Sequence, residues 1–234
     1  MKTLICVPTY NERENIAPIS EAIFANTPDT TEILFIDDNS PDGTGVLADE
    51  LAAANPRINV LHRKNKEGLA AAYLAGFAWA LERDYEWVFE MDADFSHDPL
   101  HLKDFFREMQ SGKWGAVCGS RYIKGGGVSN WDRSRLLLSR MGSIYSSIWL
   151  GWRVKDWTGG FNAWSREALK NLKLQEIQSR GYCFQIEMKY RCMKTGTGLV
   201  EVPIIFQERR VGQSKMSGDI VSEALIGVLK LRFR

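Results

Sequence analysis

Residues 86–94 read EWVFEMDAD, and this stretch decides how the whole chain is interpreted. The run from Trp87 to Met91 is short, mostly apolar and built from residues that favour a buried strand. Asp92 and Asp94 follow at its end. Because alternate residues of a strand point to the same side, the pattern predicts a strand that aims two carboxylates at one point.

The same alternation of short apolar runs and helical stretches fills the rest of the first half. Strands are predicted at 4–7, 32–37, 58–61, 86–91 and 115–119, with helices at about 11–26, 45–54 and 68–82 and another from 98 onward. This order predicts βαβ units and an α/β fold with a mixed, mostly parallel sheet flanked by helices. Such sheets bind ligands at the carboxyl ends of their strands. That edge carries residues 8–10, 37–38 and 92–94, so three strands deliver polar groups to one rim.

The second half is less regular. A helix is predicted over 134–152, with further helices at 165–172, 183–193 and 220–231 and a strand at 200–206. The first of these helices has an apolar stripe at helical spacing, formed by Leu137, Met141, Ile144, Tyr145, Ile148 and Trp152. No internal repeat or linker interrupts the chain, which predicts a single domain over residues 1–234.

The composition is that of an ordinary globular protein, with 234 residues of which 44% are hydrophobic and 25% charged. Residues 141–152, 12 in number, form the longest uncharged stretch near the middle. A membrane-spanning helix needs about 20. The apolar run near the N-terminus is too short for a signal peptide. The four cysteines show no CxxC spacing, so we expect a cytoplasmic chain with buried, reduced thiols.

The net charge of +1 conceals a division between the two halves. Residues 1–120 contain 10 Lys/Arg and 20 Asp/Glu, whereas residues 121–234 contain 20 Lys/Arg and 9 Asp/Glu. The acidic half suits a bound cation, and the basic half suits phosphates or an anionic membrane surface. The alternative is that the halves neutralise each other across an interface. Nucleic acid is not expected as a partner, because no basic run is interleaved with aromatic residues.

The acidic residues of the rim suggest two kinds of contact. The pair Asp92 and Asp94 suits Mg²⁺ or Mn²⁺, which leave open positions for phosphate oxygens. A solvated strand end is the alternative, and the position on the rim favours the metal. Asp38 suits a ribose or base, whereas Asp42 suits the capping of a turn.

Cations and histidines complete the candidates from composition and spacing. Arg121 follows the fifth predicted strand. Arg209, Arg210 and Lys215 lie in a polar loop, which is suited to folding over a bound diphosphate. A solvated basic loop is the alternative. The histidines at 97 and 101 lack a third ligand, so we expect them on a helix surface rather than in a zinc site. No Walker loop, GxGxxG or GxSxG is present.

Together these segments resemble the family 2 glycosyltransferases with the GT-A (Rossmann-like) fold. The resemblance rests on VPTYNEREN at 7–15, FIDDNSPDGT at 35–44 and MDADFSHDP at 91–99. Further segments resemble the polyprenyl-phosphate (dolichyl-phosphate) mannose synthase branch of that family: GSRY at 119–122, GGG at 125–127 followed by Trp131, DWTGGF at 156–161, GYCFQIE at 181–187, EVPI at 201–204 and GQSK at 212–215. The resemblance covers nearly the whole chain.

This resemblance implies a GDP-mannose donor bound by residues 1–120 and a polyprenyl monophosphate acceptor bound by residues 121–234. The implied donor contacts are Pro8, Tyr10, Glu12, Ile36 and Asp38 at the guanosine, Asp92, Ala93 and Asp94 at the metal and diphosphate, and Arg121, Arg209 and Lys215 at the sugar and phosphates. Asp94 and Arg121 are the implied catalytic residues. Some relatives have a metal-binding Gln at the position of Ser96, which puts a third protein ligand in doubt.

The acceptor half is expected to meet a lipid. Residues 121–155 carry seven Lys/Arg and one Asp, and we assign the acceptor phosphate to Arg133, Ser134 and Arg135. A basic amphipathic helix lies in a membrane interface, so the 134–152 helix is predicted to dock there together with 220–231. An ordinary core-packed helix is the alternative. Many relatives add C-terminal transmembrane helices, whereas no such helix is predicted in this sequence, so we expect the chain to bind the cytoplasmic face of a membrane peripherally or through a membrane-anchored partner subunit.

Three other functions stay open from the sequence. A polyprenyl-phosphate glucosyl- or N-acetylglucosaminyltransferase would have the same motifs. A non-catalytic sugar-nucleotide-binding subunit would keep the fold, although the intact acidic and basic motifs argue against it. A sugar-1-phosphate nucleotidyltransferase would need a Gly-rich N-terminal loop, which residues 8–12 do not resemble.

Overall fold

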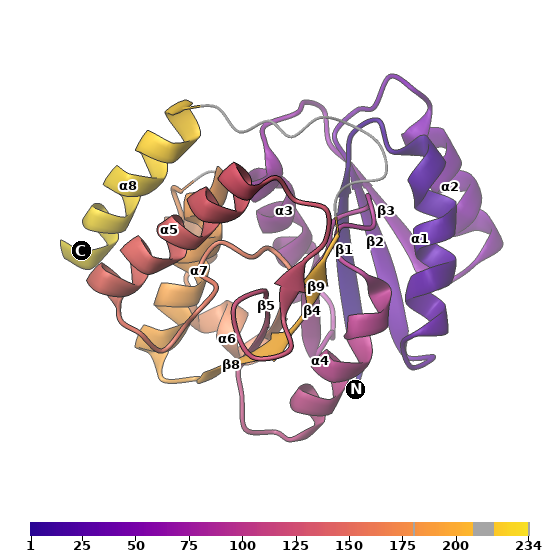
Figure 1. The fold of residues 1–234 in the computed structure, drawn as a ribbon. Helices are drawn as coiled ribbons and strands as arrows, with labels where there is room; N and C mark the ends of the chain where they lie inside the picture. The colour runs from indigo at the N-terminus through magenta and orange to yellow at the C-terminus, as the bar shows by residue number, and fades with distance from the viewer. Residues whose placement is uncertain (180, 208–217, 234) are drawn as a thin grey trace.

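A seven-stranded sheet forms the centre of the computed structural model, which describes residues 1–179, 181–207 and 218–233 (Figure 1). The strands lie in the order β3-β2-β1-β4-β7-β5-β8. Their bounds are β1 Thr3–Thr9, β2 Thr31–Asp37, β3 Ile58–His62, β4 Trp87–Glu90, β5 Ala116–Ser120, β7 Asn162–Ser165 and β8 Leu199–Pro203. All neighbouring pairs are parallel except those made by β7 with β4 and β5. The predicted mixed, mostly parallel sheet is therefore confirmed.

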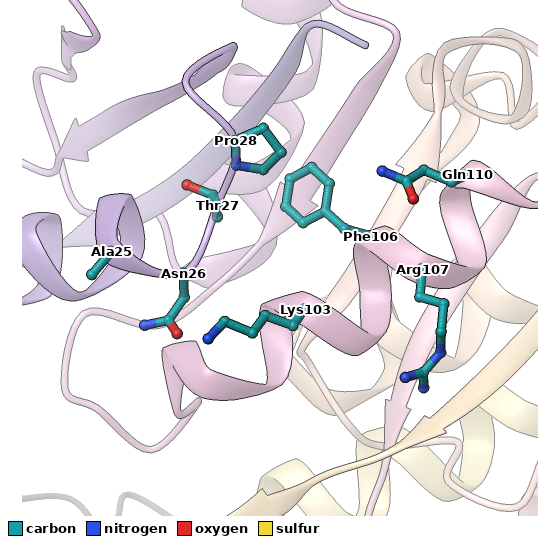
Figure 2. Close-up of a pocket in the computed structure, with 8 residues that line it drawn as sticks. All are labelled: Ala25, Asn26, Thr27, Pro28, Lys103, Phe106, Arg107 and Gln110. Atoms are coloured by element: carbon teal, nitrogen blue, oxygen red, sulfur yellow. The ribbon is translucent and has the colours of Figure 1, made fainter.

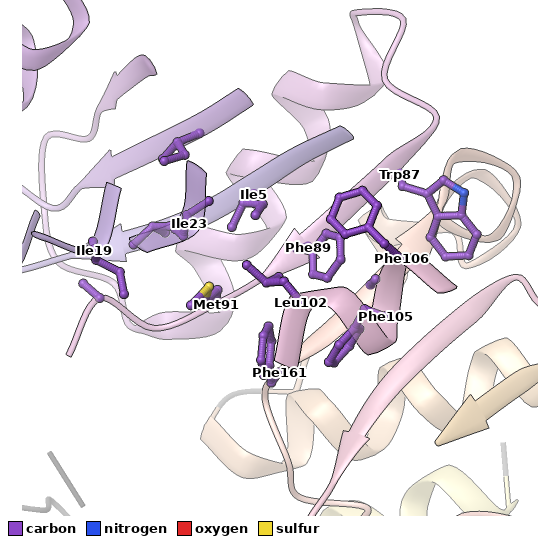
Figure 3. Packing of buried hydrophobic residues seen from close by; sticks show 14 of the residues in the cluster. Ile5, Ile19, Ile23, Trp87, Phe89, Met91, Leu102, Phe105, Phe106 and Phe161 are labelled. Carbon is purple, nitrogen blue, oxygen red and sulfur yellow. The ribbon is translucent and has the colours of Figure 1, made fainter. Parts of the chain in front are cut away.

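Helices cover both faces of this sheet because its inner strands are apolar on both sides. Ile5 and Val7 pack with α1 (Arg13–Ala25), α2 (Thr44–Ala54) and α4 (Leu102–Gln110) in the cluster that Figure 3 shows. Leu4 and Cys6 point the opposite way, to α3 (Leu69–Leu81), α6 (Arg166–Asn171) and α7 (Gly181–Thr195). The strand period of two thus places each face of the sheet against its own helical layer.

Two parts of the strand prediction are wrong. Strand β7 was not expected, because its sequence NAWS is neither an apolar run nor an alternating one. The single strand predicted over 200–206 is two strands, β8 and β9 (Ile205–Phe206). Strand β9 leaves the main sheet and pairs with β6 (Gly127–Val128), which was also not predicted. The break falls at Ile204, which is buried against the core.

A third helical group lies beside the sheet rather than on it. Helix α5 (Arg133–Leu150) and helix α8 (Gly218–Phe233) run side by side in Figure 1 and pack with α7 around Trp157. The Tyr145 hydroxyl donates to the carbonyl of Leu225 at 3.1 Å, which joins the two helices. The helices predicted over 134–152 and 220–231 are thereby confirmed.

The burial of the four cysteines agrees with the prediction from the sequence. Cys6, Cys118, Cys183 and Cys192 are all free and buried, as predicted. Burial raises the pKa of the Cys118 thiol far above its ordinary value. Among the described residues, none of the helices combines the length and apolar character needed to cross a membrane.

Candidate active site

The carboxyl ends of β1, β2 and β4 bring the predicted polar residues to one rim. At the end of β2, Asp37 is part of the turn itself: it accepts from the Thr9 hydroxyl at 3.2 Å and from the amide and hydroxyl of Ser40 at 3.1 and 2.6 Å. Asp42 accepts from the Thr44 amide and hydroxyl at 3.0 and 2.6 Å, so its predicted capping role is confirmed.

Asp38 lies beside this turn and is paired with a cation. Its Oδ1 accepts from Arg63 Nη1 at 2.6 Å, and both side chains are almost buried. Burial raises the pKa of Asp38 even though Arg63 opposes that shift. The carboxylate is thus held at the rim in a fixed direction, and a nucleoside hydroxyl would meet an acceptor that is already oriented.

The other predicted donor residues are arranged around that point. Tyr10 is exposed and the Lys66 ammonium lies 3.5 Å from its ring centroid. The Glu12 carboxylate accepts from the Asn15 amide at 2.7 Å. Pro8 is half-buried, and it is the register partner of Ile36. The Ile36 side chain is fully buried beneath α3, so any contact that it makes with a ligand is through its backbone.

The acidic pair follows β4 directly. Asp94 is 5% exposed, and its Oδ1 accepts from the amide of Ser96 at 3.0 Å. Asp92 is half-buried, and its Oδ1 accepts from the Tyr73 hydroxyl at 3.2 Å. Ala93 between them is anchored in the core. Both carboxylates are therefore held at the rim by short contacts with the chain.

These donors fit a divalent metal ion of the Mg²⁺ or Mn²⁺ type. Two carboxylates supply hard oxygen ligands, and such ions take the remainder from water or phosphate. Within residues 1–179, 181–207 and 218–233, no group of three or more His, Cys, Asp or Glu side chains forms an all-protein metal site. The Ser96 hydroxyl, on the residue whose amide holds Asp94, is buried without a hydrogen-bond partner in that part of the chain. An orphaned buried oxygen beside the pair is suited to a ligand or its water.

The prediction of two helix-surface histidines is wrong for His97. His97 is not on a helix surface but is 2% exposed in the loop after Asp94. Its Nδ1 accepts from the amide of Asp92 at 3.0 Å. His101 lies in the short helix η1 (Pro99–His101), and its Nε2 accepts from the amide of Ile205 at 2.9 Å. A short loop rich in polar residues gives no periodic signal, so the sequence could not reveal these contacts.

Arg121 lies inside the molecule and forms an ion pair with Asp156. Its Nε and Nη2 donate to the two carboxylate oxygens at 2.6 and 2.7 Å, and Nη2 also donates to the Thr158 hydroxyl at 2.9 Å. Burial alone would raise the pKa of Asp156, but the Arg121 guanidinium holds it at about 2. The sequence predicted Arg121 as a phosphate partner and missed its partner, although Asp156 belongs to the quoted DWTGGF segment.

A buried lysine supports the same turn. Lys189, on α7, donates to the carbonyls of Asp156 at 2.7 Å and Gly159 at 2.9 Å. Below it, the Glu90 carboxylate accepts from Gln185, Trp164 and Asn162. Burial raises the pKa of Glu90 to about 7 despite these donors. This polar interior ties β4, β7 and α7 together under the rim.

The predicted acceptor residues occupy the first turn of α5. Asp132 caps that helix by accepting from the amide and hydroxyl of Ser134, while Arg133 is exposed. The Arg135 guanidinium lies 4.1 Å from the ring centroid of Trp131. Arg121 lies 5.3 Å from the same ring, so one indole is shared by a predicted acceptor cation and the buried arginine. Arg209, Arg210 and Lys215 lie outside the described residues.

A separate hollow lies at the opposite edge of the sheet. It is lined by the C-terminal end of α1, the following turn and one side of α4, with residues Ala25, Asn26, Thr27, Pro28, Lys103, Phe106, Arg107 and Gln110 (Figure 2). This edge is where β2 begins, whereas the acidic pair follows the end of β4. The hollow therefore takes no part in the rim.

Comparison with known proteins identifies the family and agrees with the fold. The model of glycosyl transferase family 2 matches residues 4–173. Solved structures of glucosyl-3-phosphoglycerate synthase from Mycobacterium tuberculosis have the same fold; one, with Mn²⁺, UDP-glucose and phosphoglyceric acid, has a TM-score of 0.73 at 18% identity, over 99% of this chain and 80% of that one. The fold and the rim thus define a GT-A glycosyltransferase. The chain belongs to glycosyl transferase family 2.

Two relatives match over almost the full length. Polyprenol monophosphomannose synthase of Mycolicibacterium smegmatis is 47% identical over 234 residues, which is 100% of this chain and 88% of that protein. Undecaprenyl-phosphate mannosyltransferase of Micrococcus luteus is 44% identical over 230 residues, covering 98% of this chain and 93% of that protein. Both halves of the chain are therefore represented in these relatives.

Proposed function

We propose that this chain transfers mannose from GDP-mannose to a polyprenyl monophosphate, with inversion at the anomeric carbon. The observation that carries the proposal is the full-length similarity, at 44–47% identity, to two proteins named for polyprenyl-phosphate mannosylation. The rim supports it, because carboxylates, an oriented Asp38 and buried cations lie where GT-A folds hold a sugar nucleotide.

The acceptor accounts for the lack of an assigned base at this site. In the proposed step an oxygen of the acceptor phosphate bonds to the anomeric carbon while the bond from that carbon to the nucleotide diphosphate breaks. A phosphate monoester has a second pKa of about 6, so the attacking oxygen carries no proton to be removed. Positioning of the two substrates and stabilisation of the leaving charge then suffice.

The acidic pair is assigned to the leaving group. Asp92 and Asp94 would hold a Mg²⁺ or Mn²⁺ ion, and the ion when bound neutralises charge on the departing diphosphate. The Tyr73 hydroxyl donates to Asp92 and the Ser96 backbone amide donates to Asp94, and these contacts keep the carboxylate oxygens at the rim. Arg209 and Lys215 are assigned to the same diphosphate from the resemblance alone.

The acceptor phosphate is assigned to the start of α5. Arg133, Ser134 and Arg135 form its first turn, where a helix N-terminus and two guanidinium groups favour an anion. Arg135 and Arg121 both lie against the ring of Trp131, and Arg121 is paired with the Asp156 turn. An acceptor held there would lie between the donor rim and α5.

The outward face of α5 supports a lipid acceptor. Most of the predicted stripe does not pack into the core: Leu137, Met141, Ile144 and Ile148 of α5, and Trp152 just beyond it, are between 48% and 61% exposed, whereas Tyr145 packs against the cluster around Trp157. The face that is buried instead carries Ser143, Ser146 and Ser147, together with Leu150 at the end of the helix. We therefore assign the apolar face of α5, extended by Leu225 and Ile226 of α8, to the interface of an anionic bilayer.

The experiment that tests the function offers the protein a panel of nucleotide sugars with Mg²⁺ and a short polyprenyl phosphate, and identifies the glycolipid by mass. We expect product from GDP-mannose and its loss in Asp94→Asn. Asp29→Asn, at an exposed carboxylate, is the matched control and should keep full turnover. Product from a UDP-sugar alone would reassign the donor, and no product from any sugar would favour a non-catalytic binding subunit.

A further inference from the structure

His97 is a buried histidine that no assigned step uses. It is 2% exposed, and its Nδ1 accepts a hydrogen bond from the backbone amide of Asp92 at 3.0 Å. An accepting Nδ1 carries no proton, which fixes the tautomer of the ring. The contact is made to the main chain of the first carboxylate of the pair and not to its side chain.

The ring of His97 is held on two sides by aromatic residues. Phe161 stacks on it with centroids 4.9 Å apart and an interplanar angle of 15°. Phe206, on β9, meets it edge-on at 5.5 Å and 82°. Phe161 directly follows the turn that pairs with Arg121, and Phe206 lies 5.7 Å from the Arg121 guanidinium carbon. One imidazole therefore contacts the carboxylate loop and both segments that surround the buried cation.

The loop from Asp92 to His97 needs such a tie. Phe95 has a φ of 62°, in the left-handed region that bulky residues rarely adopt. The amide of Gln207, next to β9, donates to the Ser96 carbonyl at 3.2 Å. The hydrogen bond between the Asp92 amide and His97 joins the two ends of this loop, and the contact from Gln207 fixes the loop to β9. The direction of the Asp92 carboxylate then depends on where His97 holds its backbone.

We infer that His97 is a positioning residue for the metal-binding carboxylates, acting through the Asp92 amide. The inference rests on the proposed function, which assigns a divalent ion to Asp92 and Asp94. His97 sets the position of Asp92 relative to Phe161 and β9, so the ligand pair is placed in register with the Arg121 side of the site. Partners that orient metal ligands typically account for about 10- to 100-fold in metal affinity.

Two substitutions test separately the hydrogen-bond acceptor atom and the aromatic ring of His97. His97→Phe keeps an aromatic ring between Phe161 and Phe206 but removes the acceptor for the Asp92 amide. His97→Asn loses the ring but places its Oδ1 where Nδ1 stood, so the amide keeps an acceptor. Both variants are expected to lower the melting temperature, and each is studied well below it.

The measurement is binding of Mn²⁺ alone, followed by the loss of the free Mn²⁺ electron paramagnetic resonance signal. We expect His97→Phe to weaken Mn²⁺ binding by about 10-fold or more and His97→Asn to stay within about threefold of the unmodified chain. In the mannosyl transfer assay, the half-saturating Mn²⁺ concentration of His97→Phe should rise by a similar factor, while turnover at saturating Mn²⁺ largely recovers. A residue that merely stabilised the fold would leave the half-saturating concentration unchanged.

Each remaining outcome overturns a distinct claim. If the unmodified chain binds Mn²⁺ and His97→Phe binds it equally well, the positioning role is wrong and the proposed function stands. If both variants lose Mn²⁺ to the same degree, the ring and not the acceptor places Asp92, and the inference is again wrong. If the unmodified chain binds no Mn²⁺, the metal assignment within the proposed function fails, and the inference fails with it.

Discussion

Arg121 is the residue at which charge, burial and aromatic packing meet. It donates to both oxygens of Asp156, and the rings of Trp131 and Phe206 lie 5.3 and 5.7 Å from its guanidinium carbon. Because Asp156 offsets most of its charge, the proposed function would have Arg121 meet an anionic ligand chiefly as a directional hydrogen-bond donor. Its pairing also stabilises the turn that precedes β7.

Removing one partner of this pair should be costly to stability. Arg121→Ala leaves the buried Asp156 carboxylate without its main counter-charge, and we expect the free energy of unfolding to fall by about 3–5 kcal/mol. Urea unfolding measures this. The double variant Arg121→Ala/Asp156→Asn removes the uncompensated charge and should recover a large part of the loss. Equal unfolding midpoints for Arg121→Ala and the unmodified chain would contradict this account.

The buried Glu90 carboxyl group predicts that the free energy of unfolding depends on pH. Burial raises its pKa from 4.5 to about 7, so the folded state keeps a proton that the unfolded chain has already released. The contribution of Glu90 to stability therefore falls as pH rises from about 4.5 to about 7 and is constant above that range. We expect a loss of about 3 kcal/mol across this window.

Urea unfolding at pH 5 and pH 8 checks this sign. The difference in unfolding free energy between the two pH values should be smaller in Glu90→Gln, which cannot ionise at that position. If the variant shows the same difference as the unmodified chain, the titration belongs to another group.

At the scale of elements, α5 is a helix whose polar and apolar faces are reversed. Ser143, Ser146 and Ser147 face inward, where the Ser147 hydroxyl accepts from the indole of Trp157 at 3.0 Å, and most of the apolar stripe faces outward. A helix of a water-soluble domain normally buries its apolar stripe. The reversal is stable here because α7 and α8 supply the apolar partners around Trp157. The core-packed alternative is thus wrong for every residue of the stripe except Tyr145, which packs against the cluster around Trp157.

Opposite faces of α5 should respond differently to substitution. Ile148→Glu lies on the outward face, so we expect an unchanged melting temperature but loss of flotation with anionic vesicles. Ser147→Leu overfills the buried face and should lower the unfolding free energy by about 1–3 kcal/mol while flotation persists at low temperature. Vesicle binding that survives Ile148→Glu together with Met141→Glu would rule out this face as the docking surface.

What the sequence could predict follows from how local each feature is. Strands β1 to β5 and the helices between them depend on apolar period and turn residues, so they were found. Strand β7 depends on a distant pairing: its four residues lie between β4 and β5 only because the chain returns after α5. The carboxylate pair was visible at a strand end. The partners of Arg121 and His97 could not be predicted, because they come from distant segments. Asp156 lies more than 30 residues from Arg121, and Phe161 lies more than 60 residues from His97.

At the scale of the whole molecule, the acidic and basic halves share one sheet. Strand β7 from the second half is inserted between β4 and β5 of the first. The ion pairs Arg63–Asp38, Arg121–Asp156 and Arg191–Glu187 each lie within one half. These pairs give no support to mutual neutralisation across an interface.

Salt should therefore weaken binding to anionic vesicles. Raising NaCl from 0.1 M to 1 M shortens the screening length from about 10 Å to about 3 Å, and we expect binding to fall by about tenfold or more. Binding to neutral vesicles depends on the apolar stripe and should not fall in parallel. Quantitative co-sedimentation with both vesicle types makes the comparison, and a matching loss for both would place the attraction elsewhere.

The four enclosed thiols have a practical consequence. Cys6 and Cys118 belong to inner strands, and Cys183 and Cys192 belong to α7, all out of reach of solvent. A maleimide added to the native protein meets no sulfur until a segment separates from its neighbours. The order in which the four thiols become alkylated then reports whether the helical layer or the sheet opens first, without any engineered label.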